Sequence, residues 1–384
     1  MKDETRAIHA GRDPKANHGI VNPPVYHAST VLYPTYEALR NPPSRVQYGR
    51  RGTPTTFALE DAVMALEGGA GCALVPSGLA AVTTALLALL SSGDHLLMTD
   101  SAYGPTRTFC DTFLKRMGVE TTYYDPVIGE GIKTLMTNRT KVVFVESPGS
   151  LTFEVQDIPA IAKAAHAMGA KVVLDNTWAS PLFFKPFEHG CDVSIQAATK
   201  YIVGHADTMM GTITANEDTW PLIHAAHGQL GQCAAPDDIY LALRGLRTIS
   251  VRLNQHMQQG IELATWLGER DEISHVFHPA LPSHPGHDIW KRDFLGASGL
   301  FSVVLKPVEE HALAAMLDGL NLFGMGYSWG GFESLVIPAN PRHNRTATTW
   351  DIPGRLLRFH AGLEHMDDLK ADLELAFERL KAAS

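Results

Sequence analysis

Two side chains that follow apolar segments, Lys200 and Asp175, could together do chemistry on a bound aromatic cation. Lys200 comes shortly after the apolar run 193–196, and Asp175 directly follows the apolar run 172–174. A lysine amine can form an imine with a carbonyl compound, and a carboxylate at the end of a buried strand needs a cationic partner. A protonated pyridine nitrogen is such a partner, and its ring could then act as an electron sink. A surface lysine, and a salt bridge or metal ligand for Asp175, are the ordinary alternatives.

Two further positions fit a bound ring that carries a phosphate. Ser77 and Gly78 end one apolar segment and open a helical pattern at Leu79. Free backbone N–H groups and the helix dipole make such a junction a phosphate site, although glycine turns into helices are common. Tyr103 could stack on the face of a ring, although most such tyrosines are simply packed.

The elements that must position these residues alternate between short apolar runs and amphipathic stretches. Strands are expected over 72–76, 95–99, 142–146, 171–175, 193–196 and 211–215. Helical patterns lie between them, over 57–67, 79–90, 105–117 and 158–168. This alternation predicts a parallel α/β sheet, in which ligands bind at the carboxyl ends of the strands. The polar residues fall at those ends, so several strands deliver reactive side chains to one edge.

The remainder of the chain predicts an N-terminal arm and a second domain. Residues 1–55 have few periodic apolar patterns, apart from one short helix near Tyr36, so we expect an arm that lies on a neighbouring surface. Residues 56–246 form the expected ligand-binding domain and 247–384 a smaller C-terminal α/β domain. A long helical stretch over 237–267 would bridge the two, and the last helix has an apolar stripe: Met366, Leu369, Leu373, Phe377 and Leu380.

Composition excludes several classes of function. The 32 Lys and Arg residues against 41 Asp and Glu give a net charge of −9 without a basic run, so neither nucleic acid nor an anionic membrane is an expected partner. The four cysteines form no CxxC pair, which argues against a zinc site and against a disulfide framework. The N-terminus is polar, and no apolar stretch reaches the roughly 20 residues of a membrane span. A cytoplasmic protein is expected.

The run from Asp175 to Gly211 resembles the Cys/Met-metabolism family of fold-type I pyridoxal-phosphate enzymes. Its letters are DNTWASPLFFKPFEHGCDVSIQAATKYIVGHADTMMG, and its Asp175-to-Lys200 interval is similar to that of the family. The likeness extends from Tyr48-Gly49-Arg50 to the C-terminus. It implies a transferase-like α/β fold with a large, mostly parallel sheet flanked by helices and a smaller C-terminal domain. It also implies pyridoxal 5′-phosphate as the cofactor.

The resemblance implies a role for each residue of the cofactor site. Lys200 is the implied Schiff-base lysine, Asp175 the partner of the pyridinium nitrogen, and Tyr103 the residue that stacks on the ring. Lys200 and Tyr103 are therefore the expected catalytic residues. The implied phosphate ligands are the amides of Gly78 and Leu79 and the hydroxyl of Thr199.

Two other implied roles concern a neighbouring subunit and the substrate. Tyr48 and Arg50 resemble the family's pair that reaches the phosphate of the next chain, which implies a dimer of shared sites and a homotetramer by family likeness. Arg358 resembles the arginine that binds the substrate α-carboxylate, and a bidentate guanidinium suits that planar anion.

Three departures from the broad family pattern favour one branch of it. Ala197 occupies the position of a common serine, the stretch 146–150 lacks a Pro-Thr-Asn sequence, and Gly326-Tyr-Ser-Trp-Gly-Gly331 replaces Ser-Leu-Gly-Gly. These variants are similar to those of the bacterial β-lyase branch. They imply β-elimination from L-cystathionine to homocysteine, pyruvate and ammonia, as in methionine biosynthesis. Ser328 and Trp329 would then contact the substrate, although core packing is as good an account of Trp329.

Other interpretations stay open. A related sulfur amino-acid reaction could use the same scaffold: γ-lyase, γ-synthase, cysteine desulfhydrase or alliinase-like. A non-catalytic, pyridoxal-phosphate-binding regulatory protein is an alternative of another class. A metal enzyme built on the loop with His278, His284 and His287 is disfavoured, because interspersed prolines indicate a plain loop, and no metal is expected.

Overall fold

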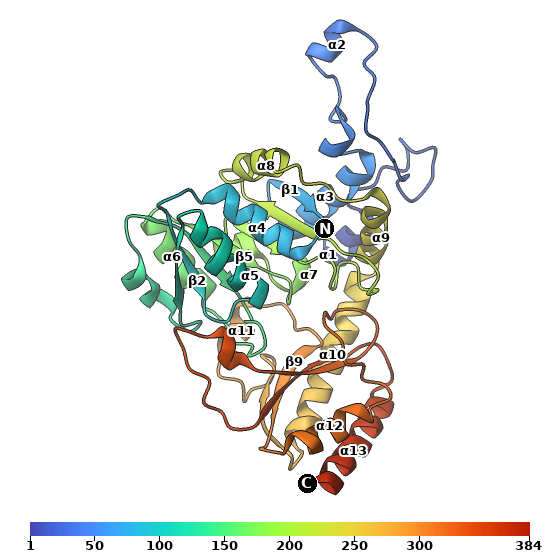
Figure 1. Ribbon diagram of the computed structural model, residues 1–384. Coiled ribbons are helices and arrows are strands. Elements are labelled where there is room, and N and C mark those ends of the chain that lie inside the picture. Colours follow the sequence, from blue (N-terminus) through green and yellow to red (C-terminus); the bar gives the residue numbers. More distant parts are fainter.

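The computed structural model describes residues 1–384 as two layered bodies and an N-terminal extension (Figure 1). The first body contains a seven-stranded sheet in the order β1-β7-β6-β5-β4-β2-β3. Its strands are β1 (Gly71–Val75), β2 (His95–Thr99), β3 (Glu120–Tyr124), β4 (Thr140–Glu146), β5 (Lys171–Asp175), β6 (Val193–Gln196) and β7 (Gly211–Ala215). Only β7 runs against the others, since it pairs antiparallel with both β1 and β6. The expected mostly parallel sheet is confirmed, and β3 is a strand that the sequence pattern did not reveal.

The sheet is buried on both faces because the middle positions of its central strands are apolar, as in residues 142–145 of β4 and 172–174 of β5. In β4, Val142 and Phe144 pack in the same cluster as α4 (Gly78–Leu89), whereas Val143 and Val145 pack with α6 (Ile158–Ala167). Successive side chains of a strand point to opposite faces, so one apolar run serves two layers of helices. This double burial fixes the strands and therefore the positions of their carboxyl ends.

The remaining helices of the first body surround this sheet. They are α3 (Pro54–Glu67), α5 (Gly104–Phe109), α7 (Ser180–Phe183), α8 (Trp220–Gln229) and α9 (Pro236–Arg247), with short turns η2 (Cys110–Leu114), η3 (Gly129–Leu135) and η4 (Pro186–His189). The single helix expected over 105–117 is thus an α-helix that continues into a π-helical turn at η2. The helical stretch expected over 237–267 is likewise two helices, since α9 ends before Thr248 and α10 (Ile249–Gly268) begins after it.

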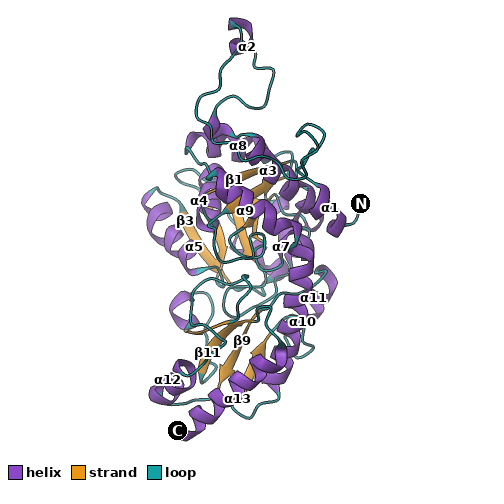
Figure 2. Cartoon of the chain, turned by 90° about the vertical axis from the view of Figure 1, so that its right-hand side faces the viewer, coloured by secondary structure: helices purple, strands orange, loops and turns teal.

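The second body is a four-stranded antiparallel sheet in the order β10-β11-β9-β8. Its strands are β8 (Ile273–Phe277), β9 (Leu300–Leu305), β10 (Leu335–Ala339) and β11 (Arg355–His360); its helices are α11 (His287–Asp293), α12 (Glu310–Asp318) and α13 (Met366–Ala383), with a short turn η5 (Pro341–Asn344). The predicted apolar stripe of α13 is buried in the same cluster as α10, α12 and this sheet. Figure 2 shows the two bodies one above the other, with α10 and α11 beside the junction.

The N-terminal extension contains α1 (Asp3–His9), α2 (Tyr36–Arg40) and a short turn η1 (Gly49–Arg51). Helix α1 packs on α3 and α9, whereas α2 projects away from the body in both views (Figures 1 and 2). Large apolar side chains of this projection face solvent, with Leu32 88% exposed. No helix of the chain has the length and apolar character needed to cross a membrane.

Candidate active site

A cavity of about 510 Å³ opens at the carboxyl ends of the parallel strands, facing the second body. Strands β1, β4, β5 and β6 each contribute side chains from the residues at or just after their ends, as expected for a parallel sheet. The predicted residues on its wall are Gly78, Leu79, Tyr103, Asp175, Thr199, Lys200, Ser328, Trp329 and Arg358. Nine of the predicted site residues therefore lie around one cavity.

Asp175 lies at the end of β5, on the side of the cavity formed by the first body, which we call the floor. Its carboxylate is held by Thr177. Its Oδ1 accepts hydrogen bonds from the Thr177 backbone N–H at 3.1 Å and from the Thr177 hydroxyl at 2.5 Å. Thr177 Oγ1 in turn accepts from the Ala197 N–H at 2.9 Å, which ties the end of β5 to the turn after β6. Burial raises the pKa of Asp175, and the two Thr177 bonds oppose that shift. No protein group bonds to Oδ2, so this oxygen is available to a cationic partner.

A site for an anion lies at the start of α4. Ser77 caps this 12-residue helix, because its hydroxyl accepts from the Ala80 N–H at 3.1 Å. The neighbouring Gly78 packs directly on Ala197: a Cβ at position 78 would lie 2.4 Å from the Ala197 methyl. A bulkier residue at 78 would therefore displace the turn that leads to Lys200. The first N–H groups of α4 are suited to a phosphate.

Lys200 lies between the floor and the second body. Its Nζ donates a hydrogen bond of 2.5 Å to Ser328 Oγ and lies 5.4 Å from the centre of the Trp329 ring. Burial and the charge of Arg358 lower the pKa of Lys200 to about 8, while Asp175 opposes the shift. A neutral amine is therefore accessible near physiological pH, as a nucleophile or base requires.

The second body contributes a strained turn that faces Lys200. Ser328 has a φ of +78°, and its carbonyl oxygen accepts from Arg358 Nη2 at 3.0 Å. Two residues on, the Gly330 N–H donates to His360 Nε2 at 3.0 Å. Burial lowers the pKa of Arg358 to about 10, which still leaves the guanidinium charged at neutral pH. A fixed cation thus lies beside the amine of Lys200.

Three other predicted residues occupy defined places. The Tyr103 backbone N–H is fixed by Glu146 Oε2 at 2.7 Å, while its ring is half exposed in the cavity. The Thr199 hydroxyl is shared with Met210, since it accepts from the Met210 N–H at 2.9 Å and lies 3.2 Å from the Met210 carbonyl. Trp329 packs against Tyr201, with ring centres 5.4 Å apart, and also lines the cavity.

Tyr48 and Arg50 do not line the cavity of their own chain. Arg50 Nη1 donates to the Gly228 carbonyl at 2.9 Å, and Tyr48 is 45% exposed on the N-terminal extension. Their predicted contact is with a neighbouring subunit, and that role stays a prediction.

The histidine-rich loop is structural. His278 Nδ1 accepts from the Ala280 N–H at 3.2 Å, and His284 Nδ1 accepts from the Gly286 N–H at 3.0 Å. No group of three or more His, Cys, Asp or Glu side chains in the chain could hold a metal ion.

The sequence indicates Glu146 only as the polar end of a strand, without a role in the site, and no role is predicted for Thr177. Glu146 pairs in register with Asp175 on the adjacent strand, and burial together with Asp175 raises the pKa of Glu146 well above its usual range. Its bond to Tyr103 joins two strand ends. Thr177 could have been found from its place two residues after Asp175, where Asx-type turns put a hydroxyl or an amide beside the carboxylate.

The donor set suits a flat ring with three functions. The free Oδ2 of Asp175 would pair with a protonated ring nitrogen, the start of α4 would take a phosphate, and Lys200 would condense with an aldehyde. Gly78 contributes no side chain to the start of α4, and its close contact with Ala197 leaves no room for one at this position.

Comparisons with known proteins agree with this chemistry. Residues 4–378 match the family described as Cys/Met metabolism PLP-dependent enzyme. The chain is 46% identical to a cystathionine β-lyase of Haemophilus influenzae, with 98% of each chain covered, and 45% identical to the cystathionine β-lyase of Escherichia coli, with 99% of each covered. A cystathionine γ-synthase of Xanthomonas oryzae, solved in complex with cystathionine, superimposes with a TM-score of 0.92 at 31% identity over the full length of both chains. The chain therefore belongs to this family of pyridoxal-phosphate enzymes.

Proposed function

We propose that this member of the family is a cystathionine β-lyase, which splits L-cystathionine with water into homocysteine, pyruvate and ammonia. The observation that supports the chemistry best is the amine of Lys200, with its lowered pKa, between Asp175 on the floor and Arg358 above. The choice of β-elimination rests on two relatives of that name at 45–46% identity and on the residues that differ from γ-synthases, Ala197 and the 326–331 segment.

In this proposal the floor holds the cofactor. Asp175 would pair with the ring nitrogen, Tyr103 would cover one face of the ring, and the amides of Gly78 and Leu79 would bind the phosphate, helped by Thr199 once its hydroxyl turns from Met210. Bound pyridoxal phosphate supplies an aldehyde that condenses with amines and a protonated ring that withdraws electrons from the substrate Cα.

The second body would orient the substrate. Arg358 uses one bond on the Ser328 carbonyl, and its remaining N–H donors are suited to the α-carboxylate. Ser328 and Trp329 lie beside this point and would shape the space for the side chain. Held in this way, the substrate would lie with its Cα near the amine of Lys200, which lines the same cavity.

Lys200 would move one proton between two atoms of the substrate. Its neutral Nζ accepts the Cα proton and then donates it to the sulfur as the C–S bond breaks, so that homocysteine leaves as a thiol. The remaining three-carbon fragment takes up water and yields pyruvate and ammonia. One residue can serve as base and then as acid because the sulfur is only two bonds from Cα, so that both atoms could fall within reach of the same amine.

Product analysis tests the proposal. The purified protein, loaded with pyridoxal phosphate and given L-cystathionine, should release pyruvate, homocysteine and ammonia in equal amounts. The products 2-oxobutanoate and cysteine would mean γ-cleavage, and the β-lyase assignment would be wrong although the cofactor site would stand. Absence of both keto acids would reject lyase activity on this substrate.

The proposed assembly is a homo-oligomer with shared sites, and a tetramer by family likeness. The support is that Tyr48 and Arg50 lie outside their own cavity, on an extension with exposed apolar residues. A hybrid of Lys200→Ala chains with Arg50→Ala chains tests this. If sites are shared, random pairing gives one intact site in each mixed dimer, so activity recovers to about a quarter of wild type. Recovery to no more than the sum of the separate variants would reject sharing.

The proposed setting is the cytoplasm. All four cysteines are free, and Cys72, Cys110 and Cys191 are buried. Free thiols persist where glutathione keeps proteins reduced.

A further inference from the structure

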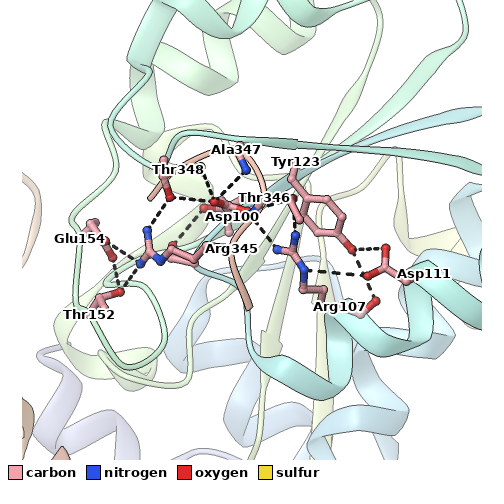
Figure 3. A network of polar contacts seen from close by, with 12 residues as sticks. Asp100, Arg107, Asp111, Tyr123, Thr152, Glu154, Arg345, Thr346, Ala347 and Thr348 are labelled. Carbon is pink, nitrogen blue, oxygen red and sulfur yellow. Dashed lines mark hydrogen bonds and ion pairs between the residues drawn. The ribbon is translucent and has the colours of Figure 1, made fainter. Parts of the chain in front are cut away.

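A buried carboxylate in the first body is bound by the backbone of the second. Asp100 follows β2, and its side chain is 0% exposed. Its Oδ1 accepts from the Thr346 N–H at 2.9 Å, and its Oδ2 accepts from the Ala347 N–H at 3.1 Å and the Thr348 N–H at 2.8 Å (Figure 3). Three consecutive N–H groups around one anion form a nest. We call residues 345–348 the latch segment.

A second anchor ties the same segment to another loop. Arg345 Nη2 donates to Glu154 Oε1 at 2.7 Å and also to the Thr152 hydroxyl, while Nη1 donates to Thr348 Oγ1 at 2.9 Å. The Arg345 side chain is only 6% exposed, and Figure 3 shows it beside Asp100, to which the next three residues of the latch segment donate. Charge-assisted bonds of this kind are about twice as strong as neutral ones.

Arg107 braces the carboxylate from the side of α5. Its Nη1 donates to Asp100 Oδ1 at 3.0 Å and its Nη2 donates to the Thr346 hydroxyl. The guanidinium lies over the ring of Tyr123, 3.5 Å from its centre, and the Tyr123 hydroxyl donates to Asp111 at 2.7 Å. The anion is thus compensated by one arginine and by the nest, which offsets the cost of its burial.

Both anchors hold loops that line the cavity. Asp100 precedes Tyr103 by three residues, and the Ser101 carbonyl accepts from the Ser150 N–H at 2.8 Å. Gly149 N–H donates to the Glu154 carbonyl at 2.9 Å. Gly149 also packs on Ser101 so closely that a Cβ would lie 2.3 Å from its hydroxyl oxygen. The loop that carries Tyr103 and the loop 149–154 are therefore fixed to each other and, through the latch segment, to the second body.

We propose that Asp100 is a positioning residue: by binding the latch segment it holds the Tyr103 loop and the 149–154 loop in their working arrangement against the second body. Asp100 does not line the cavity, whereas Tyr103 does, so Asp100 would act through Tyr103. The catalytic part of this inference rests on the proposed function, whereas the structural part does not. Arg358, which would bind the substrate carboxylate, lies outside the latch segment. Loss of the latch should therefore affect the chemical step more than substrate binding.

The variant Asp100→Asn tests this proposal. Its NH₂ group cannot accept a hydrogen bond, so it would face backbone N–H groups of the latch segment that donate to the carboxylate in the wild type. We expect hydrogen exchange of the amides 346–348 to become at least about tenfold faster, while β4 and β11 stay protected. The visible circular dichroism of bound pyridoxal phosphate should change, as Tyr103 shifts on the ring. We expect kcat for pyruvate release to fall about tenfold and KM to change less than about threefold.

The matched control is Asp111→Asn, which sits in the same network but is 50% exposed and does not touch the nest. Its exchange, dichroism and kcat should equal those of wild type, since the amide oxygen still accepts from Tyr123. Arg345→Gln breaks the second anchor alone and should shift the same three readouts in the same direction by less. If Asp100→Asn fails to fold, Arg345→Gln serves as the test variant in its place.

Wild-type exchange at 346–348 in both anchor variants would overturn the latch. Faster exchange with unchanged dichroism and unchanged kcat would overturn the positioning role. A wild-type enzyme without pyruvate release would reject the proposed function instead, and exchange and dichroism would still decide the latch.

Discussion

The two sides of the cavity are built in different ways. On the floor, bonds run between near neighbours: Asp175 is held by Thr177, and Ser77 caps α4 through Ala80. On the opposite side, hydrogen bonds join residues far apart in the sequence. Lys200 and Ser328 are separated by 128 residues, and Asp100 is separated from its partners in the latch segment by 246 to 248 residues. The floor therefore depends on one buried sheet, whereas the facing side depends on how two bodies pack. Variants on the floor should change cofactor binding, whereas a variant of Arg358 on the facing side should change substrate binding.

The largest effect is expected where the two sides meet. Lys200→Ala removes both the point of attachment and the proton carrier, so pyruvate release should fall by about 10⁴-fold or more. The visible absorbance of the attached cofactor should also disappear. Lys115→Ala, an exposed lysine on the first body, is the control and should match wild type in both measurements. Turnover by Lys200→Ala close to wild type would refute its role.

The next largest effect is expected on the floor. Asp175→Asn cannot hold a protonated ring nitrogen by charge, so kcat should fall about a hundredfold or more, with a smaller change in KM. Without cofactor, the charged form of Asp175 is expected to lower the stability of the fold. Because the folded pKa of Asp175 is raised, the folded apo-protein retains a proton that the unfolded chain loses above about pH 4, and stability falls as pH rises toward the folded value.

Thermal unfolding measures this contrast. Apo Asp175→Asn should be at least as stable as apo wild type near neutral pH, and the added stability from pyridoxal phosphate should be smaller in the variant. An equal gain from cofactor in both proteins would contradict the pairing of Asp175 with the ring.

On the facing side, Arg358→Ala should raise KM about thirtyfold to a hundredfold, because charged hydrogen bonds contribute about 1.5–3 kcal/mol each. Cofactor absorbance should be retained. Arg355→Ala is the matched control on the same strand, where the arginine pairs only with exposed Glu310. An unchanged KM in Arg358→Ala would contradict the carboxylate site.

The variant Arg358→Ala also tests how the facing side controls the pKa of Lys200. The amine of Lys200 is reactive when neutral, so the rate at which apo-protein captures pyridoxal phosphate should rise with pH and level off above about 8. Arg358 lowers this pKa, so Arg358→Ala should move the midpoint upward. Stopped-flow absorbance across the pH range checks this, and a midpoint that moves down would contradict the stated electrostatics.

The smallest effect is expected at Ser328. Removal of its bond to Lys200 in Ser328→Ala should lower kcat about fivefold. Ser328→Gly removes the same hydroxyl but accepts the positive φ without strain, so it should be more stable than the alanine variant in thermal unfolding. Equal stability of the two would indicate that the turn is not strained.

The floor was predictable from sequence because local patterns fix it. Apolar runs placed six of the seven strands, and parallel strands bring Gly78, Asp175 and Lys200 to one edge whatever the loops do. Strand β3 escaped notice because Glu120–Tyr124 is polar and half exposed at the sheet edge. The break at Thr248 was hidden because apolar periodicity continues through it.

The facing side needed more than local pattern. Arg358 and Ser328 were found through resemblance, since nothing in their own segments places them near Lys200. The hydrogen bonds between Asp100 and the latch segment cannot be predicted from the sequence, because the donors are backbone N–H groups and almost every residue type has one. Glu146 was noticed as a strand end, but its bond to Tyr103 depends on a loop conformation.

The bond between His360 and Gly330 fixes a tautomer. Because Nε2 accepts from the Gly330 N–H, the ring proton must sit on Nδ1, which lies 3.2 Å from the Glu333 carbonyl. Burial, with the nearby charges of His256, Arg358 and Lys200, holds the pKa of His360 well below its usual range. The imidazole therefore stays uncharged through the pH interval in which histidines ordinarily become protonated. Its bond to Gly330, and with it the turn that carries Ser328, should persist at a mildly acidic pH that would protonate an exposed histidine.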